Sequence, residues 1–211
     1  MSEWLETAGR RFARLVTRAV VARPWLWRVF RPLMRAQFDR LASIWDARRG
    51  PEAHAALEAA FDRLDTEPRR VLDVGTGTGQ AARYIAARFP AVEVVAVDQS
   101  PAMIEEARRL LPDEIRERVR FEVADAAGLP YAEAAFDLLV FLNMIPFFDE
   151  IARLTAPGGS AVFAFSSGPE TPIYTPPETL RERLARRGFD RFEEFAAEGA
   201  TALLARRAEA G

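Results

Sequence analysis

The sequence predicts an α/β protein, a Rossmann-like and doubly wound parallel sheet that follows a helical extension over residues 1–50. Three observations lead to this fold class. Short apolar runs rich in β-branched residues alternate with stretches at helical spacing, as in βαβ units. A glycine-rich turn at residues 75–79 joins the first such run to a helix. The last two strand-like runs meet at Glu198-Gly199, which predicts a terminal hairpin.

The composition is typical of an ordinary globular protein. Apolar residues make up 49% of the 211 residues and charged residues 28%, enough for a full core. Cysteine is absent and His54 is the single histidine, so we expect neither a disulfide framework nor a metal site. The net charge is −2, yet residues 1–50 carry 11 arginines against four carboxylates. This asymmetry indicates an anionic partner for the N-terminal segment.

The N-terminal segment is predicted to be helical. Residues 4–22 are amphipathic, Arg23-Pro24 ends this helix, and Pro32 starts a second one that runs to about Trp45. No apolar stretch is long enough to cross a bilayer. Two interpretations stay open: a lid that packs its aromatic side chains on the domain formed by residues 51–211, or a basic anchor over residues 4–35 on an anionic membrane.

The remaining elements follow in chain order. A helix is expected over residues 51–66, and the apolar run 71–74 is typical of a buried parallel strand. Ser100-Pro101 is an N-cap followed by an N1 proline, so a helix begins there. Further strands are expected at 92–97, 120–124, 136–142 and 161–165, a short helix at 147–154, a helix at 180–187, and the hairpin strands at 191–197 and 200–206.

The glycine turn places backbone N–H groups at a helix N-terminus, where a ligand can approach closely. The dinucleotide fingerprint is G-x-G-x-x-G/A, and here Gln80 takes the position of the third small residue. Asp73 lies inside the end of the strand, and its carboxylate would repel a phosphate and attract an ammonium group. A ligand with a cationic amino-acid end therefore fits better than a dinucleotide.

Residues 71–82, VLDVGTGTGQAA, resemble the first motif of the class I S-adenosylmethionine-dependent methyltransferases, small-molecule type with a methyltransferase domain of the 11/25 kind. Three further landmarks of that family follow in the same order: Asp98 at the end of the second strand, Asp125 after the third, and the turn Pro157-Gly158-Gly159. The resemblance covers residues 70–206. It implies a seven-stranded sheet of order 3-2-1-4-5-7-6 with the last strand antiparallel.

The resemblance also implies S-adenosyl-L-methionine as the cofactor. Asp73 and the glycine turn would hold its methionine end, Asp98 the ribose hydroxyls, and Asp125 with Ala126 the adenine. The expected cofactor site is Asp73, Gly75, Thr76, Gly77, Gly79, Asp98, Gln99, Met103, Asp125, Ala126 and Asn143.

The acceptor pocket is predicted less completely. Phe38 and Trp45 occupy the places of two aromatics that close the cofactor site in related small-molecule methyltransferases. Asn143 follows the strand at 136–142, so it faces the carboxyl edge of the sheet, where ligands bind. The expected pocket residues are Phe38, Trp45, Pro146, Phe147 and Tyr174. No side chain stands out as a catalytic base.

The sequence is compatible with three functions. The first is transfer of a methyl group to a small-molecule acceptor, lipophilic in character, such as a quinone, a lipid or a natural product. The second is a non-catalytic cofactor-binding or regulatory module on the same fold. The third, an NAD(P)-dependent oxidoreductase, lacks a Tyr-x-x-x-Lys pair because the chain has no lysine. A nucleic-acid substrate is not expected because the domain that follows the extension is acidic. The expected location is cytoplasmic, or peripheral at the inner membrane face.

Overall fold

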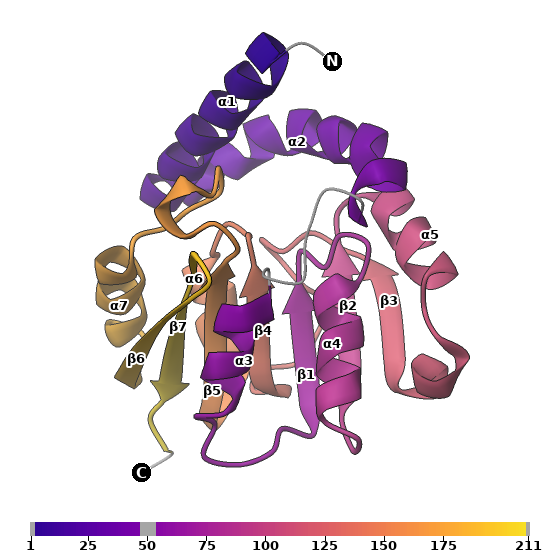
Figure 1. The fold of residues 1–211 in the computed structure, drawn as a ribbon. Coiled ribbons are helices and arrows are strands. Elements are labelled where there is room, and N and C mark those ends of the chain that lie inside the picture. The colour runs from indigo at the N-terminus through magenta and orange to yellow at the C-terminus, as the bar shows by residue number, and fades with distance from the viewer. Residues whose placement is uncertain (1–2, 47–53, 210–211) are drawn as a thin grey trace.

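The computed structural model describes residues 3–46 and 54–209, with side chains from residue 9 onward. Its centre is a seven-stranded sheet of order β3-β2-β1-β4-β5-β7-β6, which confirms the expected strand order (Figure 1). The strands are β1 (Arg70–Val74), β2 (Glu93–Asp98), β3 (Val119–Val123), β4 (Phe136–Leu142), β5 (Thr155–Phe165), β6 (Phe189–Ala197) and β7 (Ala200–Arg207).

The direction of pairing also follows the expectation. Strands β3, β2, β1, β4 and β5 pair in parallel, whereas β7 is antiparallel to both β5 and β6. Central strands covered on both faces have continuous apolar runs, and in β1 every residue from Val71 to Val74 is buried. The carboxyl ends of the parallel strands therefore meet at one edge of the sheet.

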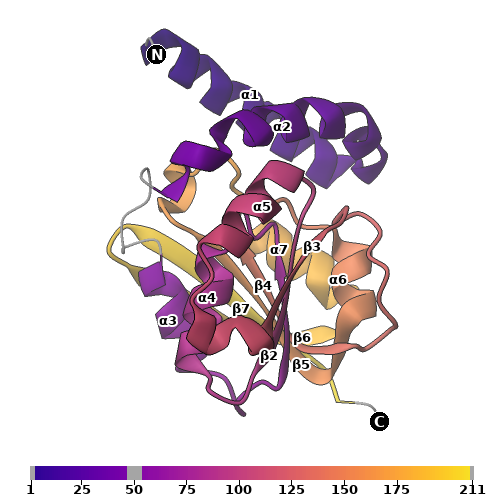
Figure 2. The ribbon, with the colours of Figure 1, turned by 90° about the vertical axis from the view of Figure 1, so that its right-hand side faces the viewer.

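Helices cover both faces of the sheet (Figure 2). One face packs against α3 (Ala55–Phe61), α4 (Gln80–Arg88) and α5 (Pro101–Arg109), with Leu57, Ile85 and Ile104 fully buried. The other packs against α6 (Phe148–Leu154) and α7 (Pro177–Ala185). Helix α1 (Glu3–Ala22) and α2 (Trp27–Leu41) lie across the carboxyl edge of the sheet, at the top of Figure 1.

Four short 3₁₀ helices join these described elements: η1 (Pro24–Leu26), η2 (Ala42–Ile44), η5 (Asp113–Arg118) and η6 (Gly168–Glu170). No helix in the described ranges is long and apolar enough to cross a bilayer. The expected domain boundary between residues 50 and 51 lies outside the described residues.

Three sequence predictions were wrong in detail. Pro32 lies inside α2 and does not start it. The helical run begins earlier, at Pro24 in η1, and a proline's missing N–H costs nothing in a first turn. Helix α2 ends at Leu41 and continues as η2, so Trp45 follows a 3₁₀ turn. The helix expected over residues 51–66 ends earlier, at Phe61, and its expected start at residues 51–53 lies outside the described residues.

The turn Pro157-Gly158-Gly159 lies within β5 as a bulge. The register passes from Phe136↔Thr155 directly to Leu138↔Ser160, so one intervening residue of β4 opposes four of β5. Gly158 has φ +72°, which only glycine adopts at low cost. The landmark is therefore present, and the strand begins before it.

Candidate functional site: a covered pocket at the carboxyl edge of the sheet

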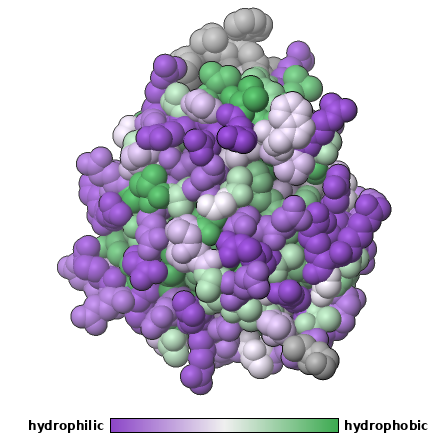
Figure 3. Space-filling model, turned by 180° about the vertical axis from the view of Figure 1, so that it is seen from behind, coloured by the Kyte–Doolittle hydropathy of each residue, from purple (hydrophilic) through white to green (hydrophobic). Residues whose placement is uncertain are grey.

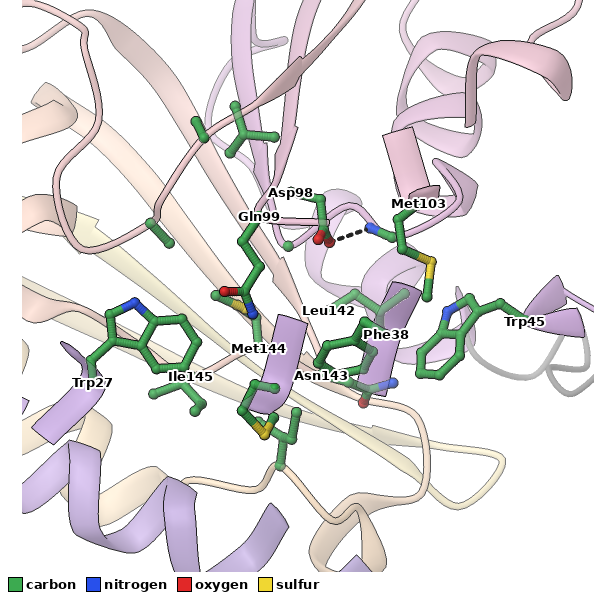
Figure 4. A pocket seen from close by; sticks show the side chains of 17 residues that line it. Trp27, Phe38, Trp45, Asp98, Gln99, Met103, Leu142, Asn143, Met144 and Ile145 are labelled. Carbon is green, nitrogen blue, oxygen red and sulfur yellow. Dashed lines mark hydrogen bonds between the residues drawn. The ribbon is translucent and has the colours of Figure 1, made fainter. Parts of the chain in front are cut away.

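A pocket lies at the carboxyl ends of the strands (Figure 4), below α2, which lies across this edge of the sheet in Figure 1. Its free volume is about 50 Å³. Its lining residues are Trp27, Met34, Phe38, Trp45, Gly75, Gly77, Val97, Asp98, Gln99, Met103, Ala124, Ala126, Leu142, Asn143, Met144, Ile145 and Ile173. Strands β1 to β4 thus supply one wall, and α2 with the segment after it supplies the apolar cover.

Asp98 is the acidic side chain among these lining residues. Its carboxylate accepts N–H groups from Gly77 and Ser100, each at 2.9 Å. Burial raises the pKa of Asp98 above its ordinary value, and the nearby Asp39 carboxylate adds to this, while the donated N–H groups oppose it. Asp98 therefore ties the glycine turn to the end of β2 and places one carboxylate at the pocket wall.

The glycine turn forms the floor of the pocket. Gly75 and Gly77 have φ of +74° and +55°, and both lie on the wall. A Cβ at Gly75 would be 2.6 Å from Met144 Sδ, and one at Gly77 would be 3.3 Å from Trp45 Nε1. Glycine therefore keeps the backbone exposed to whatever enters, and in this structure the Met144 and Trp45 side chains lie against it.

Asp73 lies beneath the turn and not on the pocket wall. It is 1% exposed, and Thr76 Oγ1 donates to Asp73 Oδ2 at 2.5 Å. Gly79 is also outside the lining: a Cβ there would be 2.6 Å from Phe121 Cζ, so this glycine permits packing of the turn against β3. Asp73 and Gly79 therefore stabilise the turn through contacts beneath it and do not line the pocket.

Asp125 is directed toward α2. Trp27 Nε1 donates to Asp125 Oδ1 at 2.7 Å, and Arg31 Nη1 approaches Oδ2 at 2.5 Å. The neighbouring Ala126 lines the pocket. The Asp125 carboxylate, which the resemblance places near an adenine, is thus bound by two side chains of α2.

Asn143 lies at the end of β4 with φ +54°, a conformation that asparagine tolerates. Its amide donates to Ser166 Oγ and accepts from Ser166 N, both at 2.9 Å, so it fastens the end of β4 to the end of β5. Phe147 packs edge-on against Trp27, and Tyr174 against Phe165, at centroid distances of 5.4 and 4.8 Å. Phe147, Tyr174 and Pro146 are not among the lining residues, although Phe147 packs against one of them, Trp27.

Several lining residues were missed by sequence reasoning, namely Trp27, Met34, Val97, Ala124, Leu142, Met144 and Ile145. A signal existed for two of them. Trp27, Met34 and Phe38 recur at helical spacing, so they share one face of α2. Met144 and Ile145 follow Asn143, but nothing in their pattern separates a pocket wall from core packing.

Polar contacts hold the cover in place. Ser100 Oγ donates to Asp39 Oδ1 at 2.5 Å and also caps α5 by accepting from Met103 N. Beyond η2, Asp46 pairs with Arg83 at 2.9 Å and accepts from Thr78 Oγ1. The cover is thus fastened to the ends of β1 and β2 in addition to its contact with Asp125.

We expect Asp125→Asn to loosen this cover without unfolding the protein. The change removes the ion pair with Arg31 and the charge that strengthens the Trp27 hydrogen bond, worth about 1–2 kcal/mol together. Amide hydrogen exchange in α2 should become roughly tenfold faster, read by mass spectrometry. Exchange in β4 serves as the internal control, and unchanged protection of α2 would contradict the role given to Asp125.

The described residues contain no cluster of three or more His, Asp or Glu side chains that could hold a metal ion. The pocket's chemistry instead fits the nucleoside expected from the sequence. It combines one ionisable carboxylate, the backbone of Gly75 and Gly77, and an apolar wall that includes Met103, Ala126 and Leu142.

Comparisons with known proteins identify the family and the fold of this chain. Residues 71–159 match the family model described as a methyltransferase domain. A demethylmenaquinone methyltransferase of Clavibacter sepedonicus is 32% identical over 83% of this chain and 70% of its own length. A malonyl-[acyl-carrier protein] O-methyltransferase of Halorhodospira halophila is 38% identical over 67% of this chain.

The chain spans about half the length of the first curated relatives that it matches, 46–50%. Among solved structures, the complex of the Haloferax volcanii Trm112 methyltransferase activator with a methyltransferase superposes with a TM-score of 0.66. It is 20% identical and covers 82% of this chain and 98% of that one, so the likeness shows the fold.

Proposed function

Because this chain belongs to the class I S-adenosylmethionine-dependent methyltransferases, we propose that it transfers a methyl group to a lipophilic small-molecule acceptor. One observation carries the proposal: the glycine turn and Asp98 share a pocket with an apolar cover. The cofactor supplies a methyl group on a sulfonium, already activated for transfer. The protein has to bind it, exclude water and align an acceptor atom.

We assign the cofactor contacts by chemistry. Asp98 accepts the ribose hydroxyls, which two carboxylate oxygens can do at once. The backbone at Gly75 and Gly77 meets the amino-acid end, and Met103 with Ala126 covers the base. Asp73, buried under the turn, adds negative charge below this cationic end. Gln99 and Asn143 complete the polar part of the wall.

The acceptor side of the proposal rests on the apolar wall. Trp27, Met34, Phe38, Ile145 and Ile173 offer no charged group to a substrate. One relative is named a demethylmenaquinone methyltransferase, and a lipophilic quinol of that class suits such a wall. Among the lining residues in the described part of the chain, Asp98 is the only carboxylate. An acceptor hydroxyl that ionises readily, as in a quinol, would not need a protein base.

Cofactor affinity should depend on pH through Asp98. Ionised Asp98 accepts the ribose hydroxyls and attracts the sulfonium, so binding favours the deprotonated form. Because the pKa of Asp98 is raised above its ordinary 3.8, affinity should begin to fall at a higher pH than for an unperturbed carboxyl. Below that point it should drop about tenfold per pH unit. Calorimetry across an acidic series measures this, with circular dichroism at each pH as the folding control. Constant affinity down to pH 3.8 would contradict it.

The test of the function is transfer of a labelled methyl group with a panel of acceptors. The panel holds quinols, hydroxylated lipids, short-chain acids and amines. We expect turnover with a lipophilic hydroxyl compound and formation of S-adenosylhomocysteine at the same rate. Turnover only with the acids or amines would refute the acceptor class.

A second candidate is a non-catalytic module that binds the cofactor. It is favoured by the side chains of Met144 and Trp45, which lie against the glycine turn, and by the scarcity of ionisable groups on the wall. Binding of cofactor without turnover on any acceptor of the panel would select this candidate over the first.

A further inference from the structure

Helix α2 is apolar on two opposite sides. Trp27, Met34 and Phe38 face the pocket, whereas Trp25, Val29 and Leu33 are 63%, 59% and 59% exposed. The exposed three are spaced four residues apart, so they form one stripe along the helix and the 3₁₀ turn before it. A helix on the surface of a globular protein normally turns a single apolar stripe inward. The outer stripe therefore has no partner within the described part of the chain.

The charges around this stripe have one sign. Arg23, Arg28 and Arg40 are exposed on the same segment, and none makes an ion pair with the described side chains. The two carboxylates between residues 9 and 46 already have partners: Asp39 contacts Ser100 and lies 3.8 Å from Arg35, and Asp46 contacts Arg83. No free carboxylate offsets the arginines in this described stretch.

Helix α1 repeats the arrangement. Leu15 is 66% exposed, and Arg11 and Arg18 lie beside it at helical spacing. Seen from behind, the molecule has hydrophobic green surface at its top, over the N-terminal helices, with purple side chains next to it (Figure 3). Exposed apolar side chains set among arginines that form no ion pair with the described side chains are the pattern of a helix that lies in a lipid headgroup region.

We infer that this surface, the docking face, binds an anionic lipid bilayer. It consists of Trp25, Val29 and Leu33 with Arg23, Arg28 and Arg40, and Leu15 with Arg11 and Arg18 add to it. The apolar side chains enter the headgroup boundary, with the tryptophan ring at the interface, and the arginines contact lipid phosphates. Each arginine near an anionic leaflet strengthens binding about fivefold.

This docking goes beyond methyl transfer, and it has a geometric consequence. The helix that touches the bilayer also covers the pocket, because its inner side chains Trp27, Met34 and Phe38 line the wall. The pocket therefore lies one helix away from the lipid. An acceptor dissolved in the bilayer would enter without crossing bulk water.

The experiment is sedimentation of the full chain with vesicles, in the absence of cofactor. We expect binding to vesicles of phosphatidylglycerol and phosphatidylcholine, release at high salt, and at least tenfold weaker binding to phosphatidylcholine alone. Trp25→Ser with Leu33→Ser should weaken binding at least tenfold. Arg28→Gln with Arg40→Gln should weaken it about 25-fold.

Arg69→Gln is the matched control, because Arg69 is an exposed arginine outside the N-terminal helices, and it should bind as the unchanged protein does. Circular dichroism and binding of S-adenosylhomocysteine verify that each variant is folded. No binding to anionic vesicles would overturn the proposal. Normal vesicle binding by the serine variant would also overturn it. So would the finding that the chain forms a dimer that buries the stripe and does not bind vesicles. Since no cofactor is present, failure here leaves the methyl-transfer proposal standing.

Discussion

Asp98→Asn should weaken binding of S-adenosylmethionine at least 100-fold. Charge-assisted hydrogen bonds contribute about 1.5–3 kcal/mol each, and the carboxylate would make two of them to the ribose. Together they approach 3 kcal/mol or more, which is a factor of about 100 in affinity. Asparagine keeps the shape and one acceptor oxygen, so the loss reports charge and hydrogen bonding and not a cavity.

The variant should remain folded. Burial raises the pKa of Asp98, so its ionised form costs stability at neutral pH, and a neutral amide removes that cost. Asp137 provides a matched control: its carboxylate also accepts two backbone N–H groups, from Arg69 and Arg70 at 2.9 Å each, at the start of β1. Asp137→Asn should leave cofactor affinity unchanged in the same calorimetric titration. Equal affinities for both variants and the unchanged protein would refute the role of Asp98.

Gly75→Ala should remove most cofactor binding while lowering stability only modestly. Its φ of +74° costs a non-glycine residue about 1–2 kcal/mol. The added methyl group points toward Met144 Sδ, 2.6 Å away, and therefore into the pocket. A methyl group forced between backbone and ligand costs about 1–3 kcal/mol, roughly tenfold to 100-fold in affinity.

Gly188→Ala separates strain from obstruction. Gly188 has φ +87°, and its added Cβ would meet nothing within 4 Å. Both variants should lose a similar free energy of unfolding, since the flexible tail of Met144 can turn aside, and only Gly75→Ala should lose cofactor affinity. Chemical denaturation and calorimetry measure the two quantities. If Gly188→Ala lost as much affinity as Gly75→Ala, the effect of Gly75 would be attributable to the fold alone.

The sheet was predictable because its signals are local. An apolar run, a glycine turn and a helical pattern are each readable within a dozen residues. The turn at Glu198-Gly199 likewise identifies the hairpin formed by β6 and β7. Asp98 was predictable for the same reason: it ends an apolar strand next to the glycine turn. Gly75 and Gly77, which have positive φ and line the pocket, follow from their spacing.

What could not be predicted depends on contacts between distant residues. Trp27 and Asp125 are 98 positions apart, and no local pattern pairs them. The bulge in β5 depends on the register with β4, which neither strand encodes alone. Met144 against Gly75 is likewise visible only once the end of β4 is placed beside the turn.

A crystal structure of the chain soaked with S-adenosylhomocysteine tests the central claim most directly. The account predicts one ligand per chain in the pocket under α2, with its ribose on Asp98 and its base against Met103. The side chains of Met144 and Trp45 should then have moved away from Gly75 and Gly77. Ligand bound elsewhere, or no ligand at millimolar concentration, would contradict it.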